Sequence, residues 1–206
     1  MLADAVFGCL AQALPGKVQA ESAGSIWMIS LNSAHGRVPR ADLEGTSDFG
    51  VLAIGLCGIG GRPGKDGLST MAFPSGIGGI PVEITESQCP LWFKEKQFLK
   101  GSGGEGEYRG GLSQRIEIRN REQAPFTISA ATFDRIKHAA QGRDGGKPGS
   151  LGVAKLGSGA ALPDKGIHIV PKGDSLILDL PGGGGFGDPN NRSSDRTAAD
   201  KKSGVI

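Results

Sequence analysis

The chain has 206 residues, of which 37% are hydrophobic, 21% are charged and 5% are aromatic. Such a chain can form one domain with a hydrophobic core. The formal net charge is only +2, so the chain has no excess of basic residues with which to bind nucleic acid. Aromatic residues are too few to form a base-stacking surface. No apolar run reaches the roughly 18–20 residues that a membrane-spanning helix needs. We therefore expect neither nucleic acid nor a membrane among the partners.

Glycine dominates the rest of the composition, with 36 residues, against a usual share of roughly 7%. A chain so rich in glycine favours short strands and many turns over helices. The three cysteines, Cys9, Cys57 and Cys89, are widely spaced and odd in number. No basic segment precedes the apolar N-terminus. Both features predict a cytoplasmic protein.

Residues 2–14, LADAVFGCLAQAL, have a helical rather than an alternating pattern. Leu2, Val6 and Leu10 fall on one helix face, and Pro15-Gly16 ends the pattern. No capping residue precedes the helix, and its apolar face needs a surface to pack against. We therefore expect that the chain begins inside a larger domain.

Short strands are predicted along most of the remaining chain, because apolar runs recur between glycine- and proline-rich turns. The loops expected between them are 32–48, 62–81 and 141–149, and residues 190–206 are expected to be a polar flexible tail. The predicted strands are 25–31, 49–61, 81–85, 91–99, 112–122, 126–133, 150–156, 166–170 and 174–180. The fold class is therefore a β-rich α+β fold, with glycine-rich antiparallel or mixed sheets, an N-terminal helix and long ordered loops.

Residues 101–111, GSGGEGEYRGG, contain the G-x-G-x-x-G spacing of dinucleotide-binding loops. That fingerprint requires a helix directly after the glycines, because the helix N-terminus holds the pyrophosphate. An alternating strand pattern follows instead. We therefore favour a glycine-rich β-connection with bulges or close backbone approach.

Residues 58–67, GIGGRPGKDG, invite comparison with a P-loop. The P-loop needs glycine and a hydroxyl residue where this chain has Ile59 and Asp66, so it is excluded. Arg62, Lys65 and Asp66 can still face a bound anion or a partner subunit, or lie in a solvated loop. We take Arg62 and Asp66 as candidate substrate- or anion-binding residues.

Two further groups of charged residues are candidates for catalysis. Glu83 and Glu86 would share a site only if the chain turns between them, because positions three apart on a strand face opposite ways. Asp134 and Arg135 lie near His138 and can form an ion pair that orients a histidine, or simply a polar strand end. No metal site is predicted, because the histidines and cysteines lack ligand spacing.

Taken together, the motifs resemble one family. GGRPGKDG (60–67), FPSGIGGIPVEITE (73–86), SGGEGEYRGGLSQR (102–115), FDR (133–135) and PKGDSLILDLPGGGGFGDP (171–189) follow one another in the order of hydantoinase B subunits, which are related to 5-oxoprolinases and to acetone and acetophenone carboxylases. The chain is similar to the C-terminal part of such a protein. Residues 1–189 form this region, which is incomplete relative to the family, and 190–206 form the tail.

This resemblance implies an ATP-dependent enzyme that opens a cyclic amide. A hydantoinase A-like subunit is expected to bind ATP and phosphorylate the small-molecule substrate. A divalent metal is expected in an upstream half of hydantoinase B. The chain is expected to be inactive alone, and the alternative is a non-catalytic structural or subunit-interaction domain left by truncation. Within the chain, the candidate catalytic residues are Glu83, Arg109, Asp134 and Arg135, acting by orientation and charge stabilisation.

Overall fold

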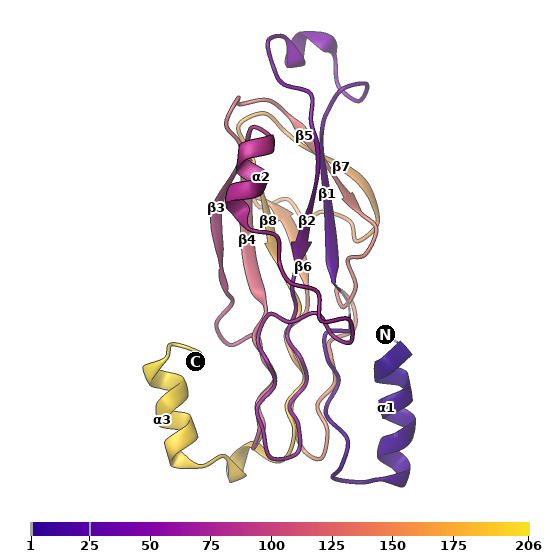
Figure 1. Ribbon diagram of the computed structural model, residues 1–206, viewed down its shortest axis with the longest axis vertical. Helices are drawn as coiled ribbons and strands as arrows, with labels where there is room; N and C mark the ends of the chain where they lie inside the picture. Colours follow the sequence, from indigo (N-terminus) through magenta and orange to yellow (C-terminus); the bar gives the residue numbers. More distant parts are fainter. Residues whose placement is uncertain (1, 25) are drawn as a thin grey trace.

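A computed structural model describes residues 2–24 and 26–206. The molecule is elongated, with two β-sheets at one end and several extended glycine-rich segments at the other (Figure 1). Helix α1 (Leu2–Ala13) and helix α3 (Ser194–Lys202) stand on opposite sides of these segments. No helix in the described part of the chain is long and apolar enough to cross a bilayer.

Each of the two sheets has four strands, and every pairing between the strands is antiparallel. The β-rich class and the N-terminal helix predicted from sequence are therefore confirmed. In the first sheet the order is β2 (Gly50–Gly55), β1 (Trp27–Ser33), β5 (Phe126–Ala130) and β7 (Gly166–Val170). In the second the order is β3 (Leu91–Phe98), β4 (Gln114–Asn120), β8 (Ser175–Asp179) and β6 (Val153–Leu156).

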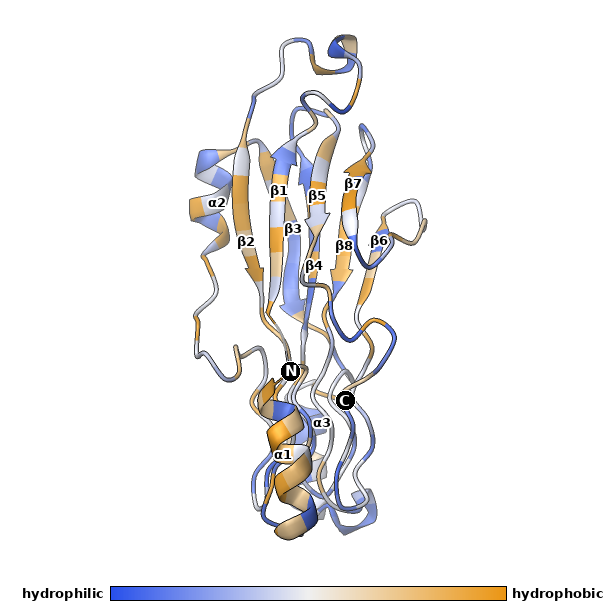
Figure 2. Cartoon of the chain, turned by 90° about the vertical axis from the view of Figure 1, so that its right-hand side faces the viewer, coloured by the Kyte–Doolittle hydropathy of each residue, from blue (hydrophilic) through white to orange (hydrophobic). Residues whose placement is uncertain are grey.

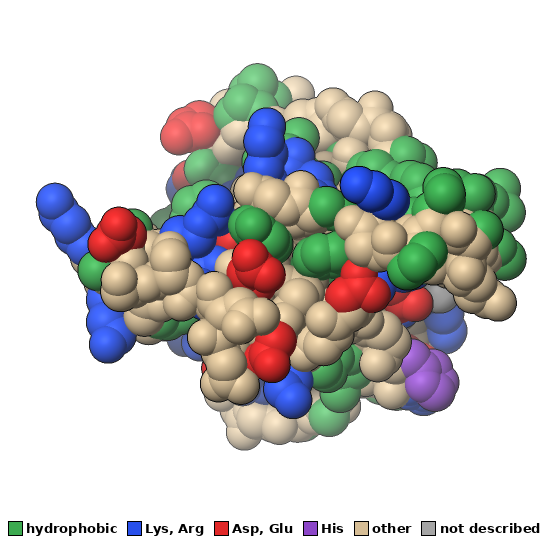
Figure 3. Space-filling view, turned by 90° about the horizontal axis from the view of Figure 1, so that it is seen from below, with side chains coloured by type: hydrophobic (Ala, Val, Ile, Leu, Met, Phe, Trp, Pro, Cys, Tyr) green, Lys and Arg blue, Asp and Glu red, His purple; other side chains and the backbone are tan. Residues whose placement is uncertain are grey.

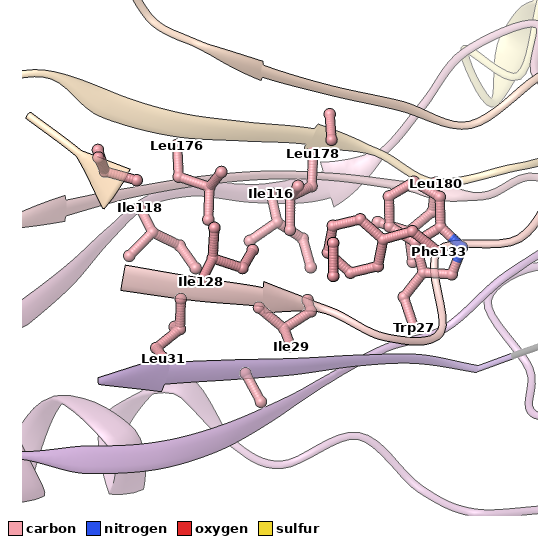
Figure 4. Close-up of a cluster of buried hydrophobic side chains, with 14 of the residues drawn as sticks. Trp27, Ile29, Leu31, Ile116, Ile118, Ile128, Phe133, Leu176, Leu178 and Leu180 are labelled. Atoms are coloured by element: carbon pink, nitrogen blue, oxygen red, sulfur yellow. The ribbon is translucent and has the colours of Figure 1, made fainter. Parts of the chain in front are cut away.

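The hydrophobic core lies between the two sheets, because apolar residues occupy every second position of the central strands (Figure 4). Ile29 and Leu31 of β1 face Ile116 and Ile118 of β4, and all four side chains are buried. At the end nearest the glycine-rich segments, Trp27 and Phe133 stack with ring centroids 4.3 Å apart. The alternation that identified these strands in the sequence thus builds the core.

The strand predicted at 81–85 is wrong, because α2 (Val82–Gln88) occupies this segment. Pro81 precedes its first residue and Glu83 lies in its first turn, and both are helix-start signals. Thr85 is the buried residue of this helix, so one helical face packs inward.

The C-terminal segment, for which the sequence predicted a polar flexible tail, is partly helical. It contains a short 3₁₀ helix (Pro189–Asn191) and the nine-residue helix α3. Ser193 caps α3 by accepting a hydrogen bond from the Arg196 N–H, and Lys201 and Lys202 lie in the last turn, where cations oppose the helix dipole. A second 3₁₀ helix (Arg40–Leu43) lies in the predicted loop 32–48.

Five extended segments form what we call the glycine bundle. They run side by side below the sheets and hydrogen-bond through their backbones. The central segment is 181–187, PGGGGFG. The other four are 19–24, 57–68, 101–112 and 140–151.

Residues 182–186 of this central segment bond its neighbours with a three-residue period. The N–H groups of Gly182 and Gly185 donate to the carbonyls of Ser150 and Lys147, in one neighbouring segment. Those of Gly183 and Phe186 donate to Gly111 and Tyr108, in another. A period of three is that of a polyproline-II path, in which an extended chain can bond neighbours on several sides.

The glycines of the bundle are required because the segments approach one another too closely for a side chain. A Cβ at Gly184 would lie 2.1 Å from the Gln141 carbonyl oxygen, and one at Gly103 would lie 2.1 Å from that of Gly110. The close backbone approach predicted for 101–111 is therefore present. The segment pairs within the bundle, and no helix follows it to form a phosphate site in the described part of the chain.

Candidate functional site

Charged side chains gather where α3 meets the glycine bundle. We call Asp66, Arg109, Arg192, Arg196 and Asp200 the C-terminal ion-pair cluster. Asp200, the buried residue of α3, lies between two arginines. Its Oδ1 is 3.2 Å from Arg109 Nε, and its Oδ2 is 2.7 Å from Arg192 Nη2. The carboxylate thus ties α3 to the bundle.

Arg192 also holds Asp66 in a two-point ion pair. Its Nη1 and Nη2 are 2.8 Å and 3.0 Å from Oδ1 and Oδ2 of Asp66. Burial alone raises the pKa of Asp66, but the hydrogen bonds and charge of Arg192 and the N–H of Arg109 outweigh it. The pKa of Asp66 therefore lies below its usual value, and that of Arg192 is raised by the same pair.

A surface cavity of about 270 Å³ opens beside this cluster. Arg109, Arg192 and Asp200 line its wall, together with Glu105, Thr197 and the close-packed Gly103 and Gly106. The arginines on this wall are paired with carboxylates, so the cavity presents a fixed array of dipoles. Such an array suits positioning of a polar group rather than nucleophilic attack.

The structure brings together three of the residues singled out from the sequence. The N–H of Arg109 donates to Asp66 Oδ1 at 2.9 Å. Arg62 reaches the same turn and donates from Nη2 to the backbone carbonyl of Asp66, also at 2.9 Å. The glycine-rich turns of 58–67 and 101–111 therefore place these residues side by side.

Asp134 and Arg135 lie in a different part of the molecule and make ion pairs with different partners. Asp134 is 3.5 Å from Lys165, at the surface. Arg135, whose side chain is only 9% exposed, pairs with Glu21 at 2.9 Å and lies 3.8 Å from Asp4 of α1. Arg135 thus helps to hold α1, as Arg109 and Arg192 hold α3.

Asp4 is the buried residue of α1. Its Oδ1 accepts a hydrogen bond from the Ser22 N–H at 3.0 Å. Burial raises the pKa of Asp4 above its usual value, although this bond and the charge of Arg135 oppose the shift. Each terminal helix is therefore fastened to the bundle by one buried carboxylate.

Glu83 and Glu86 do not form a paired site. Glu83 is exposed in the first turn of α2. Glu86 accepts hydrogen bonds from the Phe93 N–H at 2.8 Å and from Arg121 at 2.6 Å, so it fixes α2 to the second sheet.

The sequence prediction placed neither Arg192 nor Asp200 in a site, because both lie in the segment expected to be a tail. The available signal was the helix pattern around them, with a serine cap before α3 and lysines at its end.

No cluster of three histidine, cysteine, aspartate or glutamate side chains occurs in residues 2–24 and 26–206. The three cysteines are free thiols, and burial raises the pKa of Cys57 to about 12.

The family model described as hydantoinase B/oxoprolinase matches residues 1–189. The chain belongs to this family. A putative D-/L-hydantoinase B subunit from a Pseudomonas species is 26% identical over 213 residues, covering 100% of this chain and 34% of that protein. The beta subunit of caprolactamase from Pseudomonas jessenii is 27% identical over 217 residues, covering 100% of this chain and 36% of that protein.

A shorter match joins the chain to an uncharacterized protein of Methanocaldococcus jannaschii, 34% identical over 125 residues, covering 59% of this chain and 22% of that protein. The chain thus spans about a third or less of the length of these relatives.

Two solved structures share the fold. The ATP-dependent caprolactamase of Pseudomonas jessenii superposes with a TM-score of 0.75 and 21% identity, covering 96% of this chain and 35% of that chain. Nucleotide-free acetone carboxylase superposes with a TM-score of 0.69 and 22% identity, covering 96% of this chain and 30% of that chain. The family match along residues 1–189 confirms the resemblance to hydantoinase B suggested by the motifs.

Proposed function

We propose that this chain is a component of an ATP-dependent enzyme that hydrolyses a cyclic amide. The main support is the hydantoinase B/oxoprolinase match along residues 1–189. Relatives named as a hydantoinase B subunit and as the beta subunit of a caprolactamase align with the whole chain. The substrate would then be a small molecule with a lactam or hydantoin ring, and the compartment the cytoplasm.

The chemistry that needs ATP and metal is assigned to other parts of the assembly. A hydantoinase A-like subunit would bind ATP and phosphorylate the amide, which lowers the barrier to ring opening. An upstream hydantoinase B half would hold a divalent metal. The glycine bundle contributes neither group in this proposal, because its glycines are occupied by backbone packing.

Within this chain, the cavity beside α3 is the proposed contact with the reacting substrate or with the domain that carries it. Arg109 and Asp66, together with Arg192 and Asp200, would orient a polar group through their fixed dipoles. Arg62 would support Asp66. We further propose that Glu83, Asp134 and Arg135 act by orientation and charge stabilisation, although their contacts lie elsewhere.

The proposal is tested by assaying cleavage of 5-oxoproline, hydantoin and caprolactam with and without ATP. The chain alone should give no turnover. An assembly that also contains the A-like subunit and the upstream half should open at least one of these rings in an ATP-dependent manner. Turnover by the isolated chain would contradict its dependence on partners, and an inactive complete assembly would contradict the proposed reaction class.

A second candidate function is a non-catalytic subunit-interaction domain. The observation that favours it is that Arg109 pairs with Asp200 of α3 and Arg135 lies 3.8 Å from Asp4 of α1. Asp66 is likewise engaged, in an ion pair with Arg192. Arg109→Ala and Asp134→Ala separate the two functions in the active assembly. A loss of turnover that exceeds the loss of stability supports a role in the reaction, and unchanged turnover in both variants supports the interaction domain.

A further inference from the structure

Of the charged groups that line the cavity beside α3, Arg192 and Asp200 are fully engaged. Nε and Nη2 of Arg192 donate to Asp200, and its Nη1 and Nη2 donate to Asp66. Nη1 also donates to the Glu107 carbonyl at 2.9 Å. Every N–H group of Arg192 therefore has an acceptor. Asp200 accepts hydrogen bonds on both carboxylate oxygens, so these two residues hold the wall in place and have little capacity left for a ligand.

Arg109 differs from Arg192 because part of its guanidinium group is free. Its Nε donates to Asp200 Oδ1 at 3.2 Å, and its Nη1 donates to the Gly110 carbonyl at 3.1 Å. Its Nη2 donates to no residue in the described part of the chain, and solvent reaches this atom. Because Arg109 lines the cavity, Nη2 is a donor available to a ligand there. A carboxylate suits it best, since both partners are then charged.

Glu105 supplies the opposite charge on the same wall. Its side chain is exposed, and its carboxylate has no hydrogen bond or ion pair with residues 2–24 or 26–206. Its backbone is fixed nevertheless, because its carbonyl accepts from the Lys147 N–H at 2.7 Å within the bundle. The cavity is thus lined by one available cationic donor and one available carboxylate.

The remaining wall of the cavity is rigid and partly apolar. Gly103 and Gly106 are held by close backbone packing, and a Cβ on Gly103 would lie 2.1 Å from the Gly110 carbonyl oxygen. Pro189 and Ile206 add apolar surface. The volume of about 270 Å³ lies just below the range of about 300–1,000 Å³ that is usual for ligand pockets. The cavity therefore suits a small molecule with a short apolar stem.

The surroundings of the cavity favour a ligand that carries both charges. Figure 2 shows α3 and the turns of the bundle mostly in pale and hydrophilic colours. Seen from below, acidic and basic side chains lie near one another over this end of the molecule (Figure 3). A purely anionic ligand would meet Glu105 on the same wall as Arg109, and a purely cationic ligand would meet Arg109. A zwitterion is attracted at both of its ends.

We propose that this cavity binds a small zwitterion, with the ligand carboxylate on Arg109 and the ligand ammonium on Glu105. This inference deepens the proposed function and rests on it for the source of the ligand. Hydrolysis of a lactam adds water across the amide C–N bond. The acyl carbon becomes a carboxylate, and the released amine takes up the proton. The ring-opened product is therefore a zwitterion, whereas the neutral amide ring offers neither charge, so the cavity holds the product in preference to the substrate.

The test is an NMR titration of the isotope-labelled chain with ε-aminocaproate and caprolactam, which are the open and closed forms of one ring. Caproate and hexylamine serve as analogues that carry only one of the two charges. We expect ε-aminocaproate to shift the amide signals of Gly106 and Thr197, which line the cavity, in a saturable manner. The other three probes should bind at least about threefold more weakly, because each lacks one or both charge contacts.

Glu105→Gln tests the proposed ammonium contact, because it removes the charge and keeps the shape of the side chain. This variant should lose the preference for ε-aminocaproate over caproate. The matched control is Glu44→Gln, since Glu44 is an exposed carboxylate that follows the 3₁₀ helix Arg40–Leu43, away from the cavity. It should bind all four probes as the wild type does. Both positions are exposed, so thermal melting should show that both variants fold.

Three results would overturn the proposal. The first is the absence of a saturable shift at the cavity with ε-aminocaproate. The second is equal binding of caproate and ε-aminocaproate by the wild type, which would identify a simple anion site. The third is equal behaviour of Glu105→Gln and Glu44→Gln.

Ligand binding and ring opening fail separately in this design. Binding of ε-aminocaproate at the cavity, together with a complete assembly that opens no ring, supports the zwitterion site and contradicts only the proposed reaction. An active assembly whose chain does not distinguish ε-aminocaproate from caproate contradicts only the zwitterion site.

Discussion

Gly184 is enclosed by main chain on several sides. Its N–H donates to the Glu21 carbonyl at 2.9 Å, and its carbonyl accepts from the Gly61 N–H at 2.8 Å. A methyl group at this position would lie 2.1 Å from the Gln141 oxygen. Because backbone cannot rotate out of the way as a side chain can, Gly184→Ala should lower the free energy of unfolding by about 1–3 kcal/mol or more. Urea unfolding measures the difference.

Gly8 provides the control for this substitution. It lies in α1, and a Cβ there would meet nothing within 4 Å. Gly8→Ala should therefore be neutral or stabilise by up to about 1 kcal/mol, because alanine favours the helix. Equal losses in the two variants would show that crowding is not the reason for glycine in the bundle.

Asp66 should make the folded state sensitive to acid. Burial raises the pKa of the Asp66 carboxyl, but the hydrogen bonds and charge of Arg192 lower it by more. The pKa in the folded state therefore lies below the ordinary value of 3.8. A depressed carboxylate pKa stabilises the folded state above the unfolded pKa, and this stability is lost as the pH falls through the folded pKa. Unfolding free energies measured from about pH 6 down to pH 2 should fall less steeply below about pH 3.8 in Asp66→Asn than in the wild type. Parallel curves would contradict this role.

At the scale of residues, the sequence indicated Asp66, Arg62 and Arg109 as neighbours of glycine-rich turns, and these three do lie together. It could not indicate that Asp200 completes the cluster, because the contact joins residues 91 positions apart. Nor could it indicate that the adjacent Asp134 and Arg135 have different ion-pair partners, Lys165 and Glu21.

Helix α3 depends on ion pairs for its place in the molecule. Asp200 is its one buried residue and contacts both Arg109 and Arg192. Asp200→Asn leaves these arginines without this charged partner, which in buried pairs costs about 3–5 kcal/mol. We expect the amides of α3 to lose protection in hydrogen exchange while those of β1 and β8 keep theirs.

The control for α3 is Asp195→Asn, in the exposed first turn of the same helix. It removes a carboxylate of the same kind from a solvent-facing position, and it should cost α3 only the few tenths to about 1 kcal/mol of a helix-dipole interaction. If both variants release α3 equally, the helix is held by its own stability rather than by Asp200.

At the scale of elements, the strands were predictable because their inward and outward residues alternate. The patterns at 91–99 and 112–122 became β3 and β4, paired in one sheet. The segment at 81–85 was misassigned because five residues are too few to separate a helical from an alternating period. The predicted strand start at residue 25 lies outside the described residues.

The molecule as a whole combines two regions that are stabilised differently. The sheets bury a hydrophobic core, whereas the bundle is joined mainly by backbone hydrogen bonds between glycine segments. Unfolding the bundle therefore exposes much peptide surface and little apolar surface. We expect calorimetry to give a heat-capacity change per residue below the usual range of about 12–15 cal/mol/K, because polar exposure lowers this quantity. A value within that range would indicate a larger apolar core than the structure shows.

The three-residue period of residues 182–186 restricts how the chain can change in length. Adding or removing one residue in this segment rotates every later N–H group by a third of a turn about the axis of the segment. Each of these N–H groups then points toward a different neighbouring segment. Only changes of three residues restore the match, and only if the neighbouring segments lengthen with it. Evolution can therefore exchange the surface residues of this region one at a time, but its length only in threes and in several segments at once.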